Sequence, residues 1–148
     1  MKELKIYIAG KMSGLTYEEM NGWREELKKK IIIQACSVGC ENKVCVINPV
    51  DYYNFENCRH QSEAEIEDYD LAHVVTSSII VVNLEGLSTS DGTKYEIHDA
   101  NYHNRIPVIA FGDKELYEKL HPWIKRDITR VEENINDVVD YIRDFYMN

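Results

Sequence analysis

The chain of 148 residues is long enough for one domain, residues 1–148, with a sizeable hydrophobic core. Its 26 acidic side chains outnumber its 17 basic ones, and the formal charge of −9 disfavours a nucleic-acid polymer or an anionic membrane as partner. No apolar run approaches the roughly 18 residues of a membrane-spanning helix, and no secretory leader pattern opens the sequence. We therefore expect a cytoplasmic protein whose composition is compatible with a small-molecule ligand.

Short apolar runs alternate with amphipathic segments, which is typical of a parallel sheet covered by helices. Strands are predicted at residues 4–9, 44–47, 78–84 and 106–111, with an edge strand at 128–131. Helices are predicted at residues 16–30, 62–76, 91–103 and 114–120, and over a last segment that carries Ile135, Val138, Val139, Ile142 and Phe145. This order predicts an α/β fold with a doubly wound, mostly parallel five-stranded sheet of flavodoxin-like or Rossmann-like type. The pattern leaves the end of the first helix open between residues 31 and 43.

The last predicted helix indicates self-association. It carries Val138, Ile142 and Phe145 on one stripe, with Tyr141 and Tyr146 nearby. This is more apolar surface than one face of a sheet needs, so we expect a homo-oligomer.

The cysteines and histidines do not predict a metal site. The four cysteines lack the paired C-x2-C spacing of zinc sites, and His98 and His103 are not separated by the four residues of a helical metal pair. Free, reduced thiols in the cytoplasm are the expected state of the cysteines. We expect neither a metal nor an organic cofactor.

A glycine-bearing turn, residues 10–14, follows the first predicted strand. Backbone N–H groups in such a turn can face an anion, so we predict that it binds substrate through Gly10, Lys11, Met12 and Ser13. Neither G-x-G-x-x-G nor G-x-x-x-x-G-K-[ST] is present, which argues against a dinucleotide cofactor and against phosphoryl transfer. The alternative is a turn whose glycines serve only the backbone.

Asp70 lies on a helical face with side chains that point to the core. Ile66 precedes it by four residues and Val74 follows it by four. A carboxylate in that position is costly unless it is paired or hydrogen-bonded. Asp70 is therefore either a functional acid or a structural partner of another polar group.

Polar residues also gather after the third predicted strand. Ser90, Asp91, Gly92 and Glu96 follow that strand directly, and the carboxyl ends of parallel strands form the ligand-binding edge of open α/β sheets. A helix-capping role for Ser90 or Asp91, with Glu96 in the first turns, is the alternative. Together with Tyr7 and Asp70, these residues would supply a nucleophilic carboxylate, a second acid and an orienting hydroxyl at one edge.

With these residues assembled, the sequence resembles the nucleoside 2-deoxyribosyltransferase family over about its first three quarters. The segments that carry the resemblance are residues 5–14 (KIYIAGKMSG), Asn48-Pro49, Asp70-Leu71, residues 91–96 (DGTKYE) and residues 106–109 (IPVI).

The resemblance implies a role for each matched side chain. Glu96 corresponds to the nucleophile that attacks the anomeric carbon, Tyr7 to the tyrosine that orients it, and Asp70 to an aspartate that engages the base or the sugar. Ser90 stands where the transferases commonly carry aspartate and the related nucleoside 5'-monophosphate N-glycosidases carry serine. Transfer and hydrolysis of the sugar therefore both stay open. In the family, groups near the carboxyl terminus of a neighbouring subunit complete the pocket.

Three function classes follow from the sequence. The first is an enzyme that cleaves the N-glycosidic bond of 2'-deoxynucleosides or their 5'-monophosphates through a covalent bond to Glu96. The second is a nucleotide-binding or sensing module with the same fold, in which Glu96 takes no part. The third is an assembly protein that uses its acidic surface and last helix for subunit contacts.

Overall fold

The computed structural model describes residues 2–53 and 55–148. Its five strands are β1 (Glu3–Ala9), β2 (Lys43–Ile47), β3 (Ile79–Asn83), β4 (Val108–Phe111) and β5 (Arg130–Glu132). Its α-helices are α1 (Tyr17–Ser37), α2 (Glu63–Val75), α3 (Asp91–His98), α4 (Lys114–Glu118), α5 (Pro122–Lys125) and α6 (Ile135–Tyr146). Two 3-10 turns, η1 (Pro49–Asp51) and η2 (Leu87–Thr89), and a π-helical turn, η3 (Asp99–His103), complete the elements.

All four strand pairings are parallel, and the strand order is β2-β1-β3-β4-β5. This is the flavodoxin-like order of a doubly wound sheet, so the predicted α/β fold is confirmed and the flavodoxin-like alternative holds. The chain passes from β1 to β2 on one side of β1 and then crosses to β3 on the other side of β1. The switch in direction opens a crevice between the carboxyl ends of β1 and β3.

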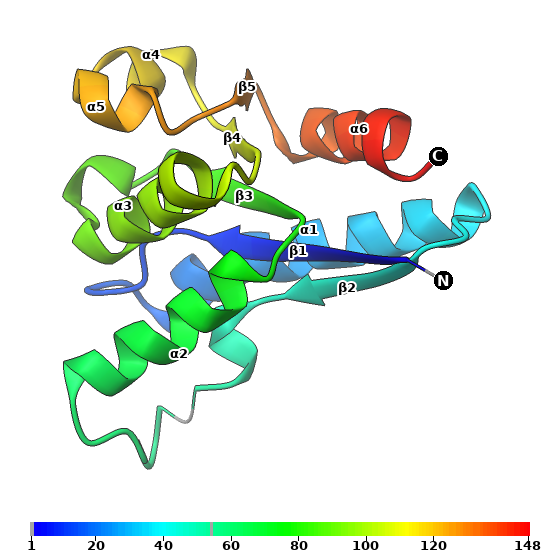
Figure 1. Ribbon diagram of the computed structural model, residues 1–148. Helices are drawn as coiled ribbons and strands as arrows, with labels where there is room; N and C mark the ends of the chain where they lie inside the picture. The colour runs from blue at the N-terminus through cyan, green and yellow to red at the C-terminus, as the bar shows by residue number, and fades with distance from the viewer. Residues whose placement is uncertain (1, 54) are drawn as a thin grey trace.

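Alternating side chains of the strands build a separate core on each face of the sheet. On β1, Ile6 and Ile8 pack with α1 and α6, while Tyr7 and Ala9 point to the opposite face. Residues of α2, α3 and α4 pack against that second face (Figure 1). Because both faces are covered, the strands are nearly continuous apolar runs.

Helix α1 is longer than predicted, since it continues to Ser37 instead of ending near residue 30. Leu27 and Ile31 are fully buried and Ala35 packs against the same core, so the four-residue spacing extends the helix across the stretch that the sequence left open. Its amino end is closed by a capping box between Thr16 and Glu19. In the described residues no helix combines the length and apolarity needed to cross a membrane.

The edge of the sheet near β5 also departs from the prediction. The edge strand lies at Arg130–Glu132, two residues beyond the predicted start, because Ile128 packs into the core beneath the strand instead of pairing.

The short helix α5 was not predicted. It begins after His121, whose ring nitrogen accepts a hydrogen bond from the Trp123 N–H, with Pro122 in the first helical position.

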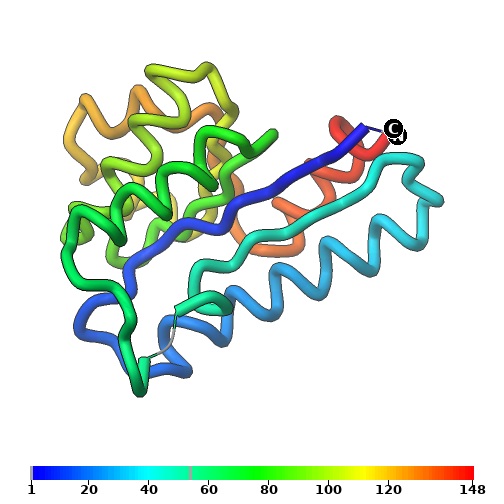
Figure 2. Tube along the Cα trace, turned by 60° about the horizontal axis from the view of Figure 1, so that its bottom comes forward, coloured from blue at the N-terminus to red at the C-terminus, as the bar shows by residue number. Residues whose placement is uncertain are grey.

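The argument for a homo-oligomer from α6 is wrong in part. Val138 and Ile142 are fully buried against the protein's own sheet, so they are core residues and not spare surface. Phe145 is 68% exposed, while Met147 after the helix is buried. Both chain ends lie at the amino end of the strands, away from the loops at their carboxyl ends (Figure 2). The homo-oligomer stays a prediction, which light scattering would test.

Candidate functional site

A cavity of about 600 Å³ opens at the carboxyl ends of β1 and β3. Its walls come from the turn after β1, the loop before α2, helix α2 and the start of α3. Nine of the ten predicted site residues line it, namely Gly10, Lys11, Met12, Ser13, Asp70, Ser90, Asp91, Gly92 and Glu96. A second cavity of about 210 Å³ shares four of these wall residues, namely Ile66, Asp70, Gly92 and Glu96. Asp70 and Glu96 therefore border both spaces.

Tyr7, the tenth predicted residue, lies beneath the cavity instead of at its edge. It is fully buried on β1, and its hydroxyl donates a hydrogen bond to Glu96 Oε2. Burial raises the pKa of Glu96 to about 7; the Tyr7 hydrogen bond and the Arg24 charge act downward, and the Asp70 charge acts upward. Burial, together with the nearby Glu96 and Asp70 charges, holds the pKa of Tyr7 well above its ordinary value, so Tyr7 remains a donor.

Asp70 is satisfied by two tyrosine hydroxyls. Tyr52 and Tyr53 both donate to Asp70 Oδ1, each at 2.5 Å. These bonds provide the compensation that a carboxylate on the inner face of α2 requires. Burial raises the pKa of both tyrosines far above the ordinary value, with Asp70 adding to the shift, so both hydroxyls stay protonated.

Ser90 occupies the cap position of α3 without capping it. Its side chain makes no cap hydrogen bond, and its Oγ instead contacts Thr93 Oγ1 at 2.7 Å. The Asp91 side chain is 90% exposed and forms a 3.7 Å ion pair with Lys94 in the next turn. Of the two acids near Glu96, Asp70 is the one enclosed by the site.

The turn after β1 has a structural reason for its glycines. A Cβ on Gly10 would lie 2.6 Å from the Trp23 ring, and Gly14 has a φ of +77°. Gly10 is therefore explained by the close approach of the Trp23 ring, and Gly14 by its backbone conformation. Lys11, in contrast, lines the cavity, and its Nζ donates to Thr89 Oγ1, another wall residue, at 3.0 Å.

Arg24 supports this turn from below, and sequence reasoning missed it. It is fully buried, and its guanidinium donates to the carbonyls of Ile8 at 2.7 Å and Gly10 at 2.8 Å. A third bond runs to the Met20 carbonyl at 2.9 Å. The signal in the sequence is its spacing, since Arg24 stands four residues after Met20 and three before Leu27, on the apolar face of α1.

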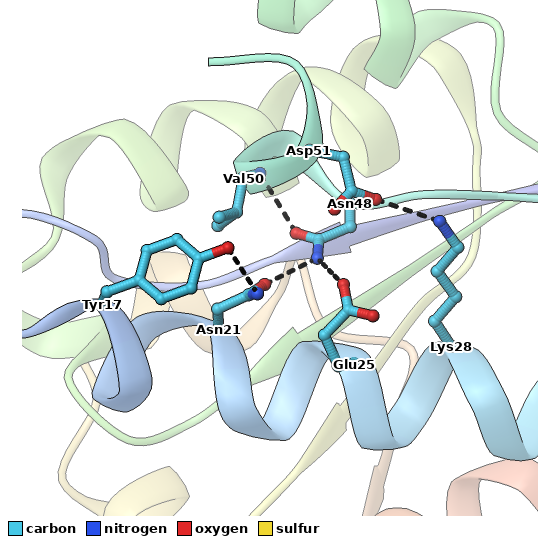
Figure 3. Close-up of polar contacts among 7 residues, drawn as sticks. All are labelled: Tyr17, Asn21, Glu25, Lys28, Asn48, Val50 and Asp51. Carbon is cyan, nitrogen blue, oxygen red and sulfur yellow. Dashed lines mark hydrogen bonds and ion pairs between the residues drawn. The ribbon is translucent and has the colours of Figure 1, made fainter. Parts of the chain in front are cut away.

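Asn48 fastens the turn after β2 to α1 (Figure 3). It is buried; its Oδ1 accepts from the Val50 N–H at 3.1 Å, and its Nδ2 donates to Asn21 at 2.8 Å and to Glu25 at 3.0 Å. An ion pair of 3.0 Å between Lys28 and Asp51 closes the same turn. The turn that precedes Tyr52 and Tyr53 is thus held at both of its ends.

Further wall residues of the larger cavity were not predicted. Half of them, Tyr53, Phe55 and Cys58, come from the loop before α2, where the sequence shows no periodicity. The other three are Ile66 on α2, Thr89 in η2 and Thr93 on α3. His98 does not line either cavity; it pairs with the buried Asp127 at 3.0 Å. Within residues 2–53 and 55–148, no three histidine, cysteine or acidic side chains come together to hold a metal ion.

The chain matches no protein-family model, and no curated protein sequence matches it. A solved structure of a conserved protein from Enterococcus faecalis V583 is 18% identical, with 96% of this chain and 98% of that chain covered and a TM-score of 0.73. A solved 2-deoxyribosyltransferase from Bacillus psychrosaccharolyticus is 19% identical, with 93% and 91% covered and a TM-score of 0.62. This second structure supports the resemblance read from the sequence, and at this identity it shows that the chain and the transferase share one fold.

Proposed function

We propose that the protein is a nucleoside 2-deoxyribosyltransferase-like enzyme that cleaves the N-glycosidic bond of 2'-deoxynucleosides or their 5'-monophosphates. The observation that carries the proposal is a buried carboxyl group, Glu96, that accepts from Tyr7 and borders two neighbouring cavities together with Asp70. The fold shared with a solved 2-deoxyribosyltransferase adds support.

In the proposed reaction, the Glu96 carboxylate attacks C1' of the sugar and forms a covalent glycosyl ester. Tyr7 orients the attacking oxygen. Asp70 takes up a proton from solvent and passes it to the departing base, and the enclosed position of Asp70 favours it over the solvent-exposed Asp91. A second base or water then displaces the sugar from Glu96, with retention at C1'.

A product analysis tests the proposed function. Purified protein is incubated with each 2'-deoxynucleoside and 2'-deoxynucleoside 5'-monophosphate, with and without a free base, and the products are identified by mass. A 2'-fluoro-2'-deoxynucleoside, which slows loss of the sugar, is expected to leave an adduct on Glu96. An adduct on another residue would reject Glu96 as nucleophile, and absence of any base release would favour the nucleotide-sensing or assembly alternatives.

Lys11 and Ser13 are proposed to bind a 5'-phosphate. Both line the larger cavity, and Ser90 adds no negative charge to it. Lys11→Ala is expected to weaken use of 5'-monophosphates by about 1.5 to 3 kcal/mol, the range of a hydrogen bond to a charged group, and to leave unphosphorylated nucleosides nearly unaffected. The measurement is kcat/KM for each matched pair of substrates, with Lys114→Ala on the remote helix α4 as control. Equal losses on both substrates would contradict a phosphate role.

The remaining expectations concern the partner and the compartment. We keep the homo-oligomer as part of the proposal, because the resemblance implies that a neighbouring copy completes the pocket. We also propose that the protein acts in the cytoplasm, since its four cysteines are free thiols, the form that a reducing compartment maintains. Ser90 keeps hydrolysis of 5'-monophosphates as the second candidate reaction, and the product analysis with and without a free base decides between transfer and hydrolysis.

A further inference from the structure

The loop after η1 brings two adjacent tyrosines to one carboxyl oxygen. Tyr52 and Tyr53 both donate to Asp70 Oδ1, and their rings contact each other with centroids 4.8 Å apart. Neither residue belongs to the segments that carry the family resemblance. Two donors on a single oxygen fix both the position and the plane of a carboxyl group.

From this geometry we infer that Tyr52 and Tyr53 are positioning residues, which hold the Asp70 carboxyl group against the bound substrate. The inference rests on the proposed function, because it assigns these tyrosines a part in the reaction of Asp70. Asp70 borders both cavities, so its orientation decides which substrate atom it meets. The two tyrosines act through Asp70 and not on the reacting atoms.

The surroundings of Tyr52 make it the stronger of the two supports. Its ring stacks on His73 at 5.3 Å and meets Tyr69 edge to face at 5.0 Å, so α2 fixes the ring from the side. Its hydroxyl also lies close enough to Tyr7, the residue that donates to Glu96, for each tyrosine to influence the pKa of the other.

Hydrogen bonds hold the chain just before the tyrosines in place. Tyr52 follows η1 directly, and its N–H donates to the Pro49 carbonyl at 3.3 Å. The buried Asn48 fixes the start of that turn on α1 through its bonds to Asn21 and Glu25 (Figure 3). Helix α1 thus holds the η1 turn, and the turn holds Tyr52, which donates to Asp70. These contacts do not involve the rest of the loop before α2.

The pKa of Glu96 reports the position of the Asp70 carboxylate, because the nearby Asp70 charge raises that pKa. Three groups act on Glu96 besides burial: burial and the Asp70 charge on α2 raise its pKa, while Tyr7 on β1 and Arg24 on α1 lower it. If Asp70 turns away, Glu96 loses one of the upward influences. The acid limb of the rate profile then moves to lower pH even as the plateau rate falls.

The experiment is a double-mutant cycle on the rate of base release from a 2'-deoxynucleoside. Tyr52→Phe and Tyr53→Phe keep the ring packing and remove only the hydroxyl, and each is combined with Asp70→Asn. We expect each tyrosine variant to lower kcat about tenfold, the low end for a hydrogen bond to a charged group, with Tyr52→Phe the larger loss. In the Asp70→Asn background the same changes are expected to have no further effect. The acid limb of the profile should move to lower pH in the Tyr52→Phe, Tyr53→Phe double variant.

Tyr69→Phe is the matched control, because Tyr69 packs against Tyr52 and its hydroxyl is not among the described donors to Asp70. Its rate and pH profile should equal those of the wild type. Losses that persist in the Asp70→Asn background, or an unmoved acid limb, would overturn the positioning role and leave the proposed function intact. Absence of base release by the wild type would instead overturn the proposed function, and this inference with it.

Discussion

Glu96→Gln is expected to abolish cleavage of the glycosidic bond, with a loss on the order of 10⁴-fold or more in kcat, the scale seen when a nucleophile is removed. An amide side chain cannot form the glycosyl ester, while its oxygen can still accept the Tyr7 hydrogen bond. The fold should therefore be retained. The wild type itself should lose activity as the pH falls through about 7, because burial raises the pKa of Glu96 to about that value and the attack needs the carboxylate.

The same substitution is expected to make the protein relatively more stable at high pH. The pKa of Glu96 is raised in the folded state from 4.5 to about 7, so between these pH values the folded protein binds more protons than the unfolded chain. The stability of the wild type then falls as the pH rises through this window, while glutamine does not titrate. The difference in unfolding free energy between variant and wild type should grow by on the order of 3 kcal/mol from below pH 4.5 to above pH 7.

Two measurements check this prediction. Base release at saturating substrate gives the catalytic loss, and urea unfolding of both proteins at a series of pH values gives the free-energy difference. Glu118→Gln, an exposed change on α4, serves as control and should alter neither quantity. Full activity in Glu96→Gln would remove Glu96 from the mechanism, and a pH-independent stability difference would contradict the raised pKa of Glu96.

Arg24→Met should produce the largest loss of stability among the predicted changes, about 2 to 4 kcal/mol of unfolding free energy. Methionine fills a similar volume but leaves the carbonyls of Ile8 and Gly10 without the donors that hold them at 2.7 and 2.8 Å. The Met20 carbonyl lies within α1, where the helix itself supplies a donor. The expected cost thus comes from the end of β1, where the turn that lines the cavity begins.

The pH profile of the same variant gives a second readout. The Arg24 charge lowers the pKa of Glu96, so its removal should move the acid limb of base release to higher pH. Arg24→Lys is the matched comparison, because lysine keeps the charge but cannot reach both carbonyls with one ammonium group. We expect Arg24→Lys to lose stability in urea unfolding with little change in the pH profile. A stable Arg24→Met protein with an unchanged profile would contradict both roles of Arg24.

The fold was predictable because its signals are local and repeated. Apolar runs such as residues 79–82 are long enough to predict buried parallel strands, and the helices between them have caps or apolar stripes. The ends of helices and strands could not be predicted where tertiary packing decides them. Ile31 and Ala35 extend α1 only because a core lies beneath them, and β5 has too few residues to produce a pattern.

The candidate site was predictable where side chains follow a strand end, and the structure brings those residues to one cavity. Their chemical roles stay predictions. Tyr52 and Tyr53 were missed because they lie in a loop without periodicity, and their partner on α2 is distant in sequence. Val138 and Ile142 were misjudged for the opposite reason: a stripe on a helix does not reveal how much of it the protein's own sheet will cover.

The packing of Gly10 against Trp23 gives the molecule its own optical probe. The chain has two tryptophans; Trp23 packs against the turn after β1, with its ring 4.7 Å from the Arg24 guanidinium carbon, whereas Trp123 on α5 is 76% exposed. Indole emission depends on the charges and the water around the ring. In a Trp123→Phe background the remaining fluorescence would come from Trp23 alone, and a nucleotide entering the cavity beside Gly10 could be followed by titration without any label or turnover.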